Sequence, residues 1–372
     1  MREKVLVAMS GGVDSSVAAA LLVEAGHDVM GVFMRVGHAA EPAPADRSLP
    51  MLDRQRGCCS ALDAGDARSV AARLAIPFYA LNFEQDFDRL IDHFAAEYAA
   101  ARTPNPCVRC NQWLKFGRLL EYADLVGAPR LATGHYARID HALGQPRLGA
   151  ARDERKDQSY VLFGIPAAAR ARTLFPLGAL TKDEVRAAAR RFGLPVHDKP
   201  ESQDICFVPD GDHAAVVARR QPDALRPGLL RHADGRLLGT HAGRARYTVG
   251  QRHGLRVALG APVYVTEIDA ESNVVTVGPR AAVLSDTLVA SKLTWWDAPA
   301  VGPVRVVARI RSNHRAAPAT LTPLTADSAR IRFDEPQLAI TPGQAVVAYD
   351  ADGWVLAGGW IERGGPAPPP TT

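Results

Sequence analysis

Residues 5–15 read Val-Leu-Val-Ala-Met-Ser-Gly-Gly-Val-Asp-Ser, an apolar run that ends in a turn with two adjacent glycines. The apolar run predicts a buried strand, and the residues from Ser15 to Ala25 predict a helix. Gly11 and Gly12 permit positive φ angles and a close approach of the backbone to a ligand. The N-terminus of the helix would direct N–H groups and a partial positive charge at that ligand. The stretch therefore predicts a phosphate site between a strand and a helix.

The pattern of this loop differs from the commoner nucleotide loops, because neither GxxxxGK[ST] nor GxGxxG fits it. Residues 10–15 resemble instead the PP-loop signature SGGxDS of enzymes that split ATP into AMP and pyrophosphate. By this resemblance Asp14 would help to position Mg²⁺-pyrophosphate, and Ser10 and Ser15 would donate to its oxygens. An ordinary strand–turn–helix with two glycines is the other interpretation.

The composition is that of a large globular chain: 372 residues, of which 47% are hydrophobic and 23% charged, with a net charge of +4. This length exceeds one hydrophobic core and predicts two or three domains. The small basic excess permits a nucleic acid partner. No apolar run approaches the ~18 residues of a membrane span, and the first residues lead straight into a strand. We therefore expect a cytoplasmic protein with neither a membrane segment nor a signal peptide.

Strands and helices alternate up to about residue 200, which predicts an α/β fold with a parallel, doubly wound sheet. Ligands of such sheets bind at the carboxyl ends of the strands, where the glycine loop, Met34 and Gly134-His135 fall. After the glycine loop we expect three more strands, at residues 29–34, 78–82 and 130–133. We also expect a long loop at residues 37–60 and two helices, at residues 63–75 and 87–101.

The character of the sequence changes after this region. Thr181 begins a capped helix that stops at Gly193, and short β-rich runs separated by Gly, Asp and Pro follow from about Asp210. These runs predict a small β domain and a β-barrel. We expect a PP-loop domain with a helical extension at residues 1–208 and a small β domain at residues 209–282. A C-terminal β-barrel would follow at residues 283–363, and a disordered Pro- and Gly-rich tail at residues 364–372.

Two prolines in the sequence Pro104-Asn105-Pro106 predict a stiff, non-helical loop that presents the pair Cys107 and Cys110. Arg109 and Lys115 add positive charge, which lowers the pKa of a thiol and favours the thiolate. A CxxC pair can be half of a zinc site, a redox pair or part of a cluster ligand set. Because no second CxxC and no HxxxH occurs, we expect no structural zinc site.

Three further segments have two interpretations each. Cys206, in the run Glu-Ser-Gln-Asp-Ile-Cys-Phe of residues 201–207, is either a buried core cysteine or a partner of Cys110. The adjacent pair Cys58-Cys59 is either two small buried hydrophobes or a redox or metal element. The run Lys156-Asp157-Gln158 is either a solvated helix start capped by its aspartate or a turn that contacts a ligand.

The chain contains, in this order, the motifs SGGVDSSV, RTPNPxxxCNxxxKF, ATGHYAR, KDQSYVL, ESxxICF, YTVGQRxGL and TPGQAVV. In this combination they resemble the bacterial tRNA-uridine 2-sulfurtransferases, the tRNA 2-thiouridylases. The resemblance runs from Lys4 to about Trp360 and covers nearly the whole chain. It implies an N-terminal PP-loop domain, a small central β domain and a C-terminal β-barrel that grips tRNA.

The resemblance also implies a chemistry, the ATP-dependent thiolation of the wobble uridine of tRNA. ATP would adenylate the C2 oxygen with release of pyrophosphate, and a persulfide sulfur would displace AMP to give 2-thiouridine. Cys206 would carry the persulfide, received from a sulfur-carrier protein, and Cys110 would attack it, releasing sulfide or closing a Cys110–Cys206 disulfide. The enzyme would act as a monomer with ATP and Mg²⁺.

Binding residues follow from the same resemblance. For ATP they are Ala8, Met9, Ser10, Gly11, Gly12, Val13, Asp14, Ser15, Met34 and Gly134. For tRNA they are Asn105, Pro106, Cys107, His135, Lys156, Asp157, Gln158, Arg311 and Gln344, although a histidine such as His135 can equally belong to the core.

The chain departs from the family in two places. Cys107 stands where some members carry an aspartate with a proton-transfer role, and Ser312 follows Arg311 where an aromatic residue is common. Three rival functions remain: another AMP-forming PP-loop ligase, an RNA-binding protein with a vestigial nucleotide loop, and a tRNA thiolase with an iron–sulfur cluster on Cys107, Cys110 and Cys206. The paired cysteines count against the first and the intact loop against the second. Apolar neighbours of Cys206 favour a persulfide over the third.

Overall fold

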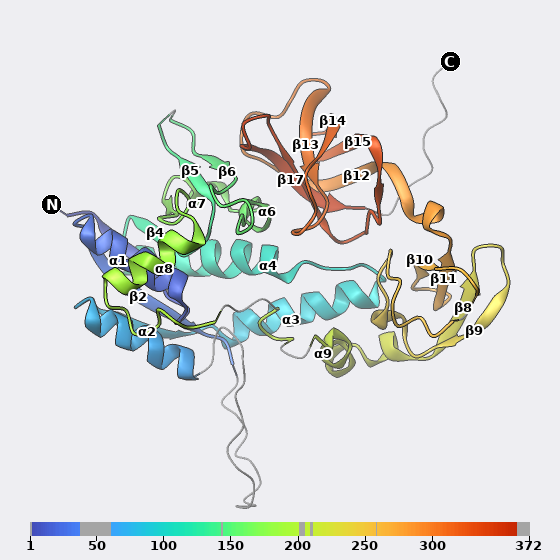
Figure 1. Cartoon of the computed structure of the whole chain (residues 1–372), viewed down its shortest axis with the longest axis horizontal. Helices are drawn as coiled ribbons and strands as arrows, with labels where there is room; N and C mark the ends of the chain where they lie inside the picture. Colours follow the sequence, from blue (N-terminus) through green and yellow to red (C-terminus); the bar gives the residue numbers. More distant parts are fainter. Residues whose placement is uncertain are drawn as a thin grey trace, which may run out of the picture. The chain divides into compact units, whose positions relative to one another are not determined.

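The computed structural model describes residues 2–37, 61–142, 144–200, 205–208, 211–257 and 259–362 (Figure 1). It divides into two compact units. Unit 1 comprises Met1–Leu90 and Cys107–Gly211, and unit 2 comprises Ile91–Pro106 and Asp212–Thr372. Four predicted features lie outside the described residues: most of the loop at 37–60, the pair Cys58-Cys59, residues 201–204 and the tail at 364–372.

Unit 1 is built on a five-stranded parallel sheet in the order β3-β2-β1-β4-β7, which confirms the predicted α/β fold. The chain adds β2 and β3 on one side of β1, and β4 and β7 on the other. The loops after β1 and β4 therefore lie at the switch point of the sheet, where ligands bind in such folds. The strands are β1 Lys4–Ala8, β2 Asp28–Arg35, β3 Phe78–Asn82, β4 Arg130–Thr133 and β7 Thr173–Leu174.

Three helices share a hydrophobic core with this sheet: α1 Val13–Glu24, α2 Ala61–Arg73 and α8 Lys182–Arg191. Val5, Leu6 and Val7 of β1 are completely buried, as the continuous hydrophobic sequence predicts for a central parallel strand. The remaining elements that begin in unit 1 are α3 Glu84–Ala99, α5 Leu119–Leu125, α6 Ser159–Leu162, α7 Ala167–Arg170, β5 Arg138–Asp140 and β6 Arg147–Gly149.

The segment that carries Cys107 and Cys110 is helical, which corrects the prediction of a non-helical loop. The short helix α4 Pro106–Arg109 leads directly into a π-helix, η1 Cys110–Arg118. Proline is tolerated in the first turn of a helix, because the N–H that it lacks has no partner there. Pro106 therefore starts this helix, and only the residues before it are extended.

Unit 2 contains a four-stranded sheet, β10-β11-β8-β9, and a closed barrel of six antiparallel strands, β12-β15-β14-β13-β16-β17. The barrel confirms the predicted C-terminal β-barrel. No described helix is long and apolar enough to cross a membrane. The elements are α9 His213–Arg220, η2 Pro222–Leu225, β8 Gly228–His232, β9 Leu237–His241, η3 Arg244–Arg246, β10 Tyr264–Asp269, β11 Val274–Gly278, η4 Arg280–Val283, β12 Leu284–Trp295, β13 Val304–Arg309, β14 Ala317–Thr325, β15 Ser328–Leu338, β16 Ala345–Tyr349 and β17 Val355–Ile361.

Candidate active site

The glycine loop joins the carboxyl end of β1 to the N-terminus of α1. Gly11 has a φ of +74°, and a Cβ atom there would lie 2.2 Å from the backbone oxygen of Asp63 in α2. Gly12 differs from the prediction, because it is extended, with a φ of −92°, as the N-cap of α1. A Cβ atom on Gly12 would make only an ordinary contact with Ser10. Of the two glycines, only Gly11 is required by the conformation of the loop.

Serine hydroxyl groups make hydrogen bonds within this loop. The Ser10 backbone N–H donates to the Ser15 hydroxyl at 3.1 Å, and the two serine hydroxyls lie 3.2 Å apart. The buried Ser16 hydroxyl donates to the Gly12 carbonyl at 2.7 Å, a contribution that the sequence pattern does not single out. Ser10 and Ser15 thus hydrogen-bond each other in this structure, and their donation to phosphate stays a prediction.

Asp14 contacts two side chains from distant parts of unit 1. Its Oδ1 accepts a hydrogen bond from the Tyr136 hydroxyl at 2.8 Å and one from the Lys182 ammonium at 2.7 Å. Sequence reasoning missed both residues. Thr181 and Glu184 form the capping box that marks the start of α8 in the sequence, but this signal does not reveal where the Lys182 side chain lies.

A second lysine holds the backbone of the loop. Lys199 Nζ donates to the Gly11 carbonyl at 3.0 Å and to the carboxylates of Asp63 and Asp66, each at 2.6 Å. Burial disfavours the charged amine, yet the hydrogen bonds to the two carboxylates raise the pKa of Lys199 above its ordinary value. The charged lysine therefore ties the first turn of α2 to the glycine loop.

Two predicted ATP-binding residues, Met34 and Gly134, lie on or directly after the strands next to β1. Gly134 directly follows β4, and a Cβ atom there would lie 2.6 Å from the backbone nitrogen of Ser15. The chain after β4 thus packs directly on the first turn of α1, and a side chain at this position would displace one of them. Met34 lies near the end of β2, two residues after Val32, whose carbonyl accepts the Met9 N–H at 2.8 Å.

His135 is buried and has a partner at each ring nitrogen. Lys115 Nζ lies 3.2 Å from Nε2, and Thr133 Oγ1 lies 2.6 Å from Nδ1. An ammonium can only donate, so Nε2 accepts and Nδ1 carries the proton that is given to Thr133. Burial holds the pKa of His135 well below its ordinary value, and the charge on Lys115 lowers it further. The imidazole is therefore neutral, and its contact with tRNA stays a prediction.

This neutral histidine predicts a loss of stability in acid. Below about pH 6.5 an ordinary histidine binds a proton in the unfolded chain, whereas His135 stays neutral in the folded protein. The unfolded state then holds more protons, so the free energy of unfolding falls as the pH drops, by at most about 1.4 kcal/mol per pH unit. His135→Gln should remove this part of the slope in urea titrations, and His253→Gln, at an exposed position, is the control substitution. If the free energy of unfolding falls with pH equally in the wild type and in His135→Gln, the prediction is wrong.

The three described cysteines are reduced thiols; Cys107 is exposed, and Cys110 and Cys206 are partly buried. Cys110 is the first residue of the π-helix, a rare element that is frequent at functional sites. The next residue, Asn111, is buried and donates from Nδ2 to the Val161 carbonyl at 2.9 Å. This bond fixes the start of η1 against α6 and so sets the direction of the helix at Cys110.

Cys206 lies in a turn beside Phe207, whose ring packs edge-on against Phe87 of α3 with 5.6 Å between ring centroids. This aromatic contact holds the cysteine segment on unit 1. Among the residues that the structure describes, no three His, Cys, Asp or Glu side chains form a group that could hold a metal. Cys107, Cys110 and Cys206 are therefore not gathered here as the ligands of a cluster.

The run Lys156-Asp157-Gln158 braces a turn. The Asp157 carboxylate accepts the N–H groups of Ala151 and of Ser159, the first residue of α6, and the Gln158 side chain accepts the N–H of Tyr136 at 2.9 Å. Asp157 thus accepts the N–H of the first residue of α6, but the N-cap of this helix is Gln158 and not the aspartate that the structural interpretation of this run predicts. Contacts of the three residues with tRNA stay a prediction.

The remaining predicted tRNA residues belong to unit 2. Gln344 Nε2 donates to the Thr103 carbonyl at 3.1 Å, and an Arg311 N–H donates to the Leu338 carbonyl at 3.2 Å. Gln344 therefore holds the extended segment that leads to Asn105 and Pro106. Its hydrogen bond is a positioning role that the sequence does not reveal, and direct binding of tRNA by these residues stays a prediction.

Arg102 anchors the same segment, because its guanidinium bridges Glu97 at 2.9 Å and Glu362 at 2.8 Å. We expect Arg102→Met to lower the free energy of unfolding by about 1–3 kcal/mol, since two half-buried carboxylates lose their partner. Arg305→Met is the matched control, because the Arg305–Asp334 pair is exposed and should matter little. Urea denaturation of both variants tests this, and equal losses would contradict it.

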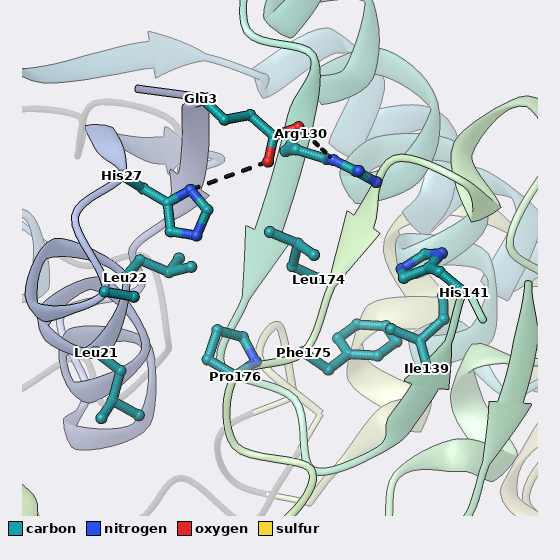
Figure 2. A pocket seen from close by; sticks show the side chains of 11 residues that line it. Glu3, Leu21, Leu22, His27, Arg130, Ile139, His141, Leu174, Phe175 and Pro176 are labelled. Carbon is teal, nitrogen blue, oxygen red and sulfur yellow. Dashed lines mark hydrogen bonds and ion pairs between the residues drawn. The ribbon is translucent and has the colours of Figure 1, made fainter. Parts of the chain in front are cut away.

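A cavity of about 330 Å³ opens in unit 1 near the residues that begin β1 and β4, at the end of these strands away from the glycine loop. Figure 2 shows Glu3 between His27 and Arg130 at its rim; Glu3 pairs with Arg130 at 2.9 Å and with His27 at 4.0 Å. None of the predicted site residues lines it. The lining residues are Glu3, Leu21, Leu22, Ala25, His27, Arg130, Ile139, His141, Leu174, Phe175 and Pro176.

The glycine loop of unit 1 lies at the switch point of a parallel sheet, and a lysine and a tyrosine from later segments contact Asp14 beside it. This arrangement defines unit 1 as an α/β domain of the HUP class. Family models agree: residues 3–210 match the tRNA methyl transferase HUP domain, residues 215–279 the tRNA methyl transferase PRC-barrel domain, and residues 285–361 the aminomethyltransferase beta-barrel domain. The predicted boundaries at 208 and 282 stay predictions.

Curated relatives narrow the class. The tRNA-specific 2-thiouridylase MnmA of Geotalea uraniireducens is 48% identical over 364 residues, which cover 97% of this chain and 96% of that protein. The enzyme of the same name from Symbiobacterium thermophilum is 47% identical over 97% of this chain and 92% of its own length. The chain belongs to the tRNA-specific 2-thiouridylase family. A solved 4-thiouridine synthetase–RNA complex is 15% identical, with a TM-score of 0.37 over 59% of this chain and 51% of that one.

Proposed function

We propose that the protein catalyses the ATP-dependent 2-thiolation of the wobble uridine in tRNA, giving 2-thiouridine, AMP and pyrophosphate. The observation that carries the proposal is the presence of the phosphate loop, Cys110 and Cys206 in one compact unit. The chain matches its relatives over nearly their whole length, and their name supports tRNA as the substrate. A persulfide carrier protein as sulfur source, a monomeric enzyme and a cytoplasmic location belong to the same proposal.

Adenylation is the first step. The uracil O2 attacks the α-phosphorus of ATP, the bond from that phosphorus to the bridging oxygen breaks with its electron pair on pyrophosphate, and the N3 proton of the uracil passes to water. The glycine loop and the N-terminus of α1 supply N–H groups for the phosphate oxygens. Activation is needed because the carbonyl oxygen of uracil is a poor leaving group, whereas AMP is a good one.

Sulfur transfer is the second step. Cys206 carries a persulfide, and the Cys110 thiolate attacks its inner sulfur, so that a Cys110–Cys206 disulfide forms and sulfide leaves. The outer sulfur is thereby reduced by two electrons, and the two cysteine sulfurs are oxidised by two. Sulfide then adds to C2 of the adenylated uridine, and the C2–O bond breaks with its electron pair on AMP. An external thiol must reduce the disulfide before the next turnover.

Mg²⁺ fits this loop as an ion that arrives with the substrate. Asp14 offers one carboxylate, and the described part of the chain has no group of three acidic, His or Cys side chains that would form a protein cage. Mg²⁺ at phosphate sites is usually held by one or two carboxylates together with substrate phosphates. Bound there, it would neutralise part of the phosphate charge.

Two other functions are less well supported. The methyl transferase wording of the family models names a different reaction, but two cysteines in the same compact unit as a pyrophosphate-type loop suit sulfur transfer. An iron–sulfur-dependent thiolation would use Cys107, Cys110 and Cys206 together, and the structure does not assemble them as metal ligands.

An ATP–pyrophosphate exchange assay tests the proposal. We expect exchange of labelled pyrophosphate into ATP only when unmodified tRNA is present, because the acceptor of the adenylyl group is the uridine. Exchange that requires a small carboxylic acid and no tRNA would indicate another AMP-forming ligase. Tight tRNA binding without exchange under any condition would indicate an RNA-binding protein with an inactive loop.

A further inference from the structure

Lys182 is an almost completely buried lysine, and its side chain is only 9% exposed. Its ammonium lies 2.7 Å from Asp14 Oδ1 and 5.7 Å from the centre of the Tyr136 ring. Asp14 is the acidic residue in the first turn of α1, directly after the glycine loop. The charge of Lys182 is thus held at the phosphate loop, inside a part of the protein where a cation is costly to bury.

The position of Lys182 is set by several contacts. It is the first residue of α8, and the capping box of Thr181 and Glu184 fixes this helix start. Its backbone N–H donates to Asp153 Oδ2 at 3.0 Å. These contacts hold the backbone, so only the side chain of Lys182 has freedom to change partner. A buried ion pair by itself adds little to the stability of a protein. We therefore look for a functional reason for the position of the Lys182 charge.

We propose that Lys182 is a catalytic residue of the adenylation step, which pairs with Asp14 before ATP binds and with a β- or γ-phosphate oxygen of ATP afterwards. The proposal rests on the proposed function. Asp14 is then available to the Mg²⁺ that accompanies ATP. The ammonium stabilises the negative charge that grows on pyrophosphate while the bond to the α-phosphorus breaks, as fixed cations do in phosphoryl transfer.

Binding to the intact, full-length protein tests this without tRNA or persulfide. Isothermal calorimetry with ATP, pyrophosphate and AMP, each with MgCl₂, compares wild type with Lys182→Gln. We expect ATP and pyrophosphate to bind about 10- to 100-fold more weakly, because a charge-assisted hydrogen bond is lost, and AMP to bind unchanged. Lys182→Arg keeps the charge and should bind ATP more tightly than Lys182→Gln. The exposed Lys292→Gln in the barrel is the matched control.

Tyr136→Phe separates a catalytic from a purely structural lysine, because it removes the other hydrogen bond to Asp14 without changing charge. If Lys182 only orients Asp14, Tyr136→Phe reproduces the loss of ATP and pyrophosphate binding, and the proposal is overturned. An equal loss of ATP and AMP binding in Lys182→Gln, or no loss at all, also overturns it. A wild-type protein that binds ATP but does not thiolate tRNA would contradict the proposed function alone.

Discussion

Replacing Asp14 by asparagine should reduce the adenylation of tRNA by at least about 10²-fold, while tRNA binding is retained. The substitution keeps the shape of the side chain but removes the carboxylate that faces Lys182 and Tyr136 at the phosphate loop. The predicted barrel contacts lie in unit 2, whereas Asp14 lies in unit 1, so we expect the two properties to separate. Adenylated tRNA is measured by mass and affinity by filter binding.

The control is Asp28→Asn, an exposed carboxylate at the start of β2. Because Asp14→Asn removes a carboxylate that pairs with the buried Lys182 ammonium, the unfolding transition of each variant has to be recorded as well. A folded Asp14→Asn protein that loses adenylation and tRNA binding to the same extent would contradict the separation of roles.

Substituting the cysteines should give the second large effect. Cys110→Ser and Cys206→Ser should each lower thiolation by about 10³-fold or more, because a serine hydroxyl neither forms a persulfide nor attacks one. Cys107→Ser should retain thiolation with a persulfide-loaded donor, since the persulfide route does not use it. All three variants should retain pyrophosphate exchange with tRNA, which precedes sulfur transfer.

These variants also decide between a persulfide and a cluster. Protein purified without oxygen should carry no stoichiometric iron if Cys110 and Cys206 act as a pair of thiols. The cluster mechanism would be favoured if Cys107→Ser is as inactive as the other two and iron is lost together with activity. Iron content and thiolation therefore have to be measured on the same preparations.

The sequence predicts the strand, turn and helix that carry the site well, because these elements follow one another directly along the chain. A continuous apolar run, a glycine turn and an alanine-rich helix occupy consecutive residues, and β1 and α1 lie where that pattern places them, with α1 starting two residues early. The capping box of α8 is equally local and is predictable for the same reason. In contrast, β12 is hard to recognise in the sequence, because its charged and hydroxyl residues interrupt the alternation of apolar ones.

The electrostatics of the site could not be predicted, because they depend on residues far apart in the chain. Lys182 lies 168 residues from Asp14, and Lys199 lies 188 residues from Gly11. The helical conformation of the CxxC segment was missed for a different reason. A proline reads as a breaker in sequence, but Pro106 occupies the one turn of a helix that accepts it.

The most direct test of the account is the mass of the wobble nucleoside after reaction of unmodified tRNA with the protein, ATP, Mg²⁺ and a persulfide-loaded donor. The account predicts exchange of one oxygen for one sulfur in uridine, with AMP and pyrophosphate formed in amounts equal to the 2-thiouridine. A methylated nucleoside, a thiolated one formed without ATP, or ADP and phosphate as products would contradict it.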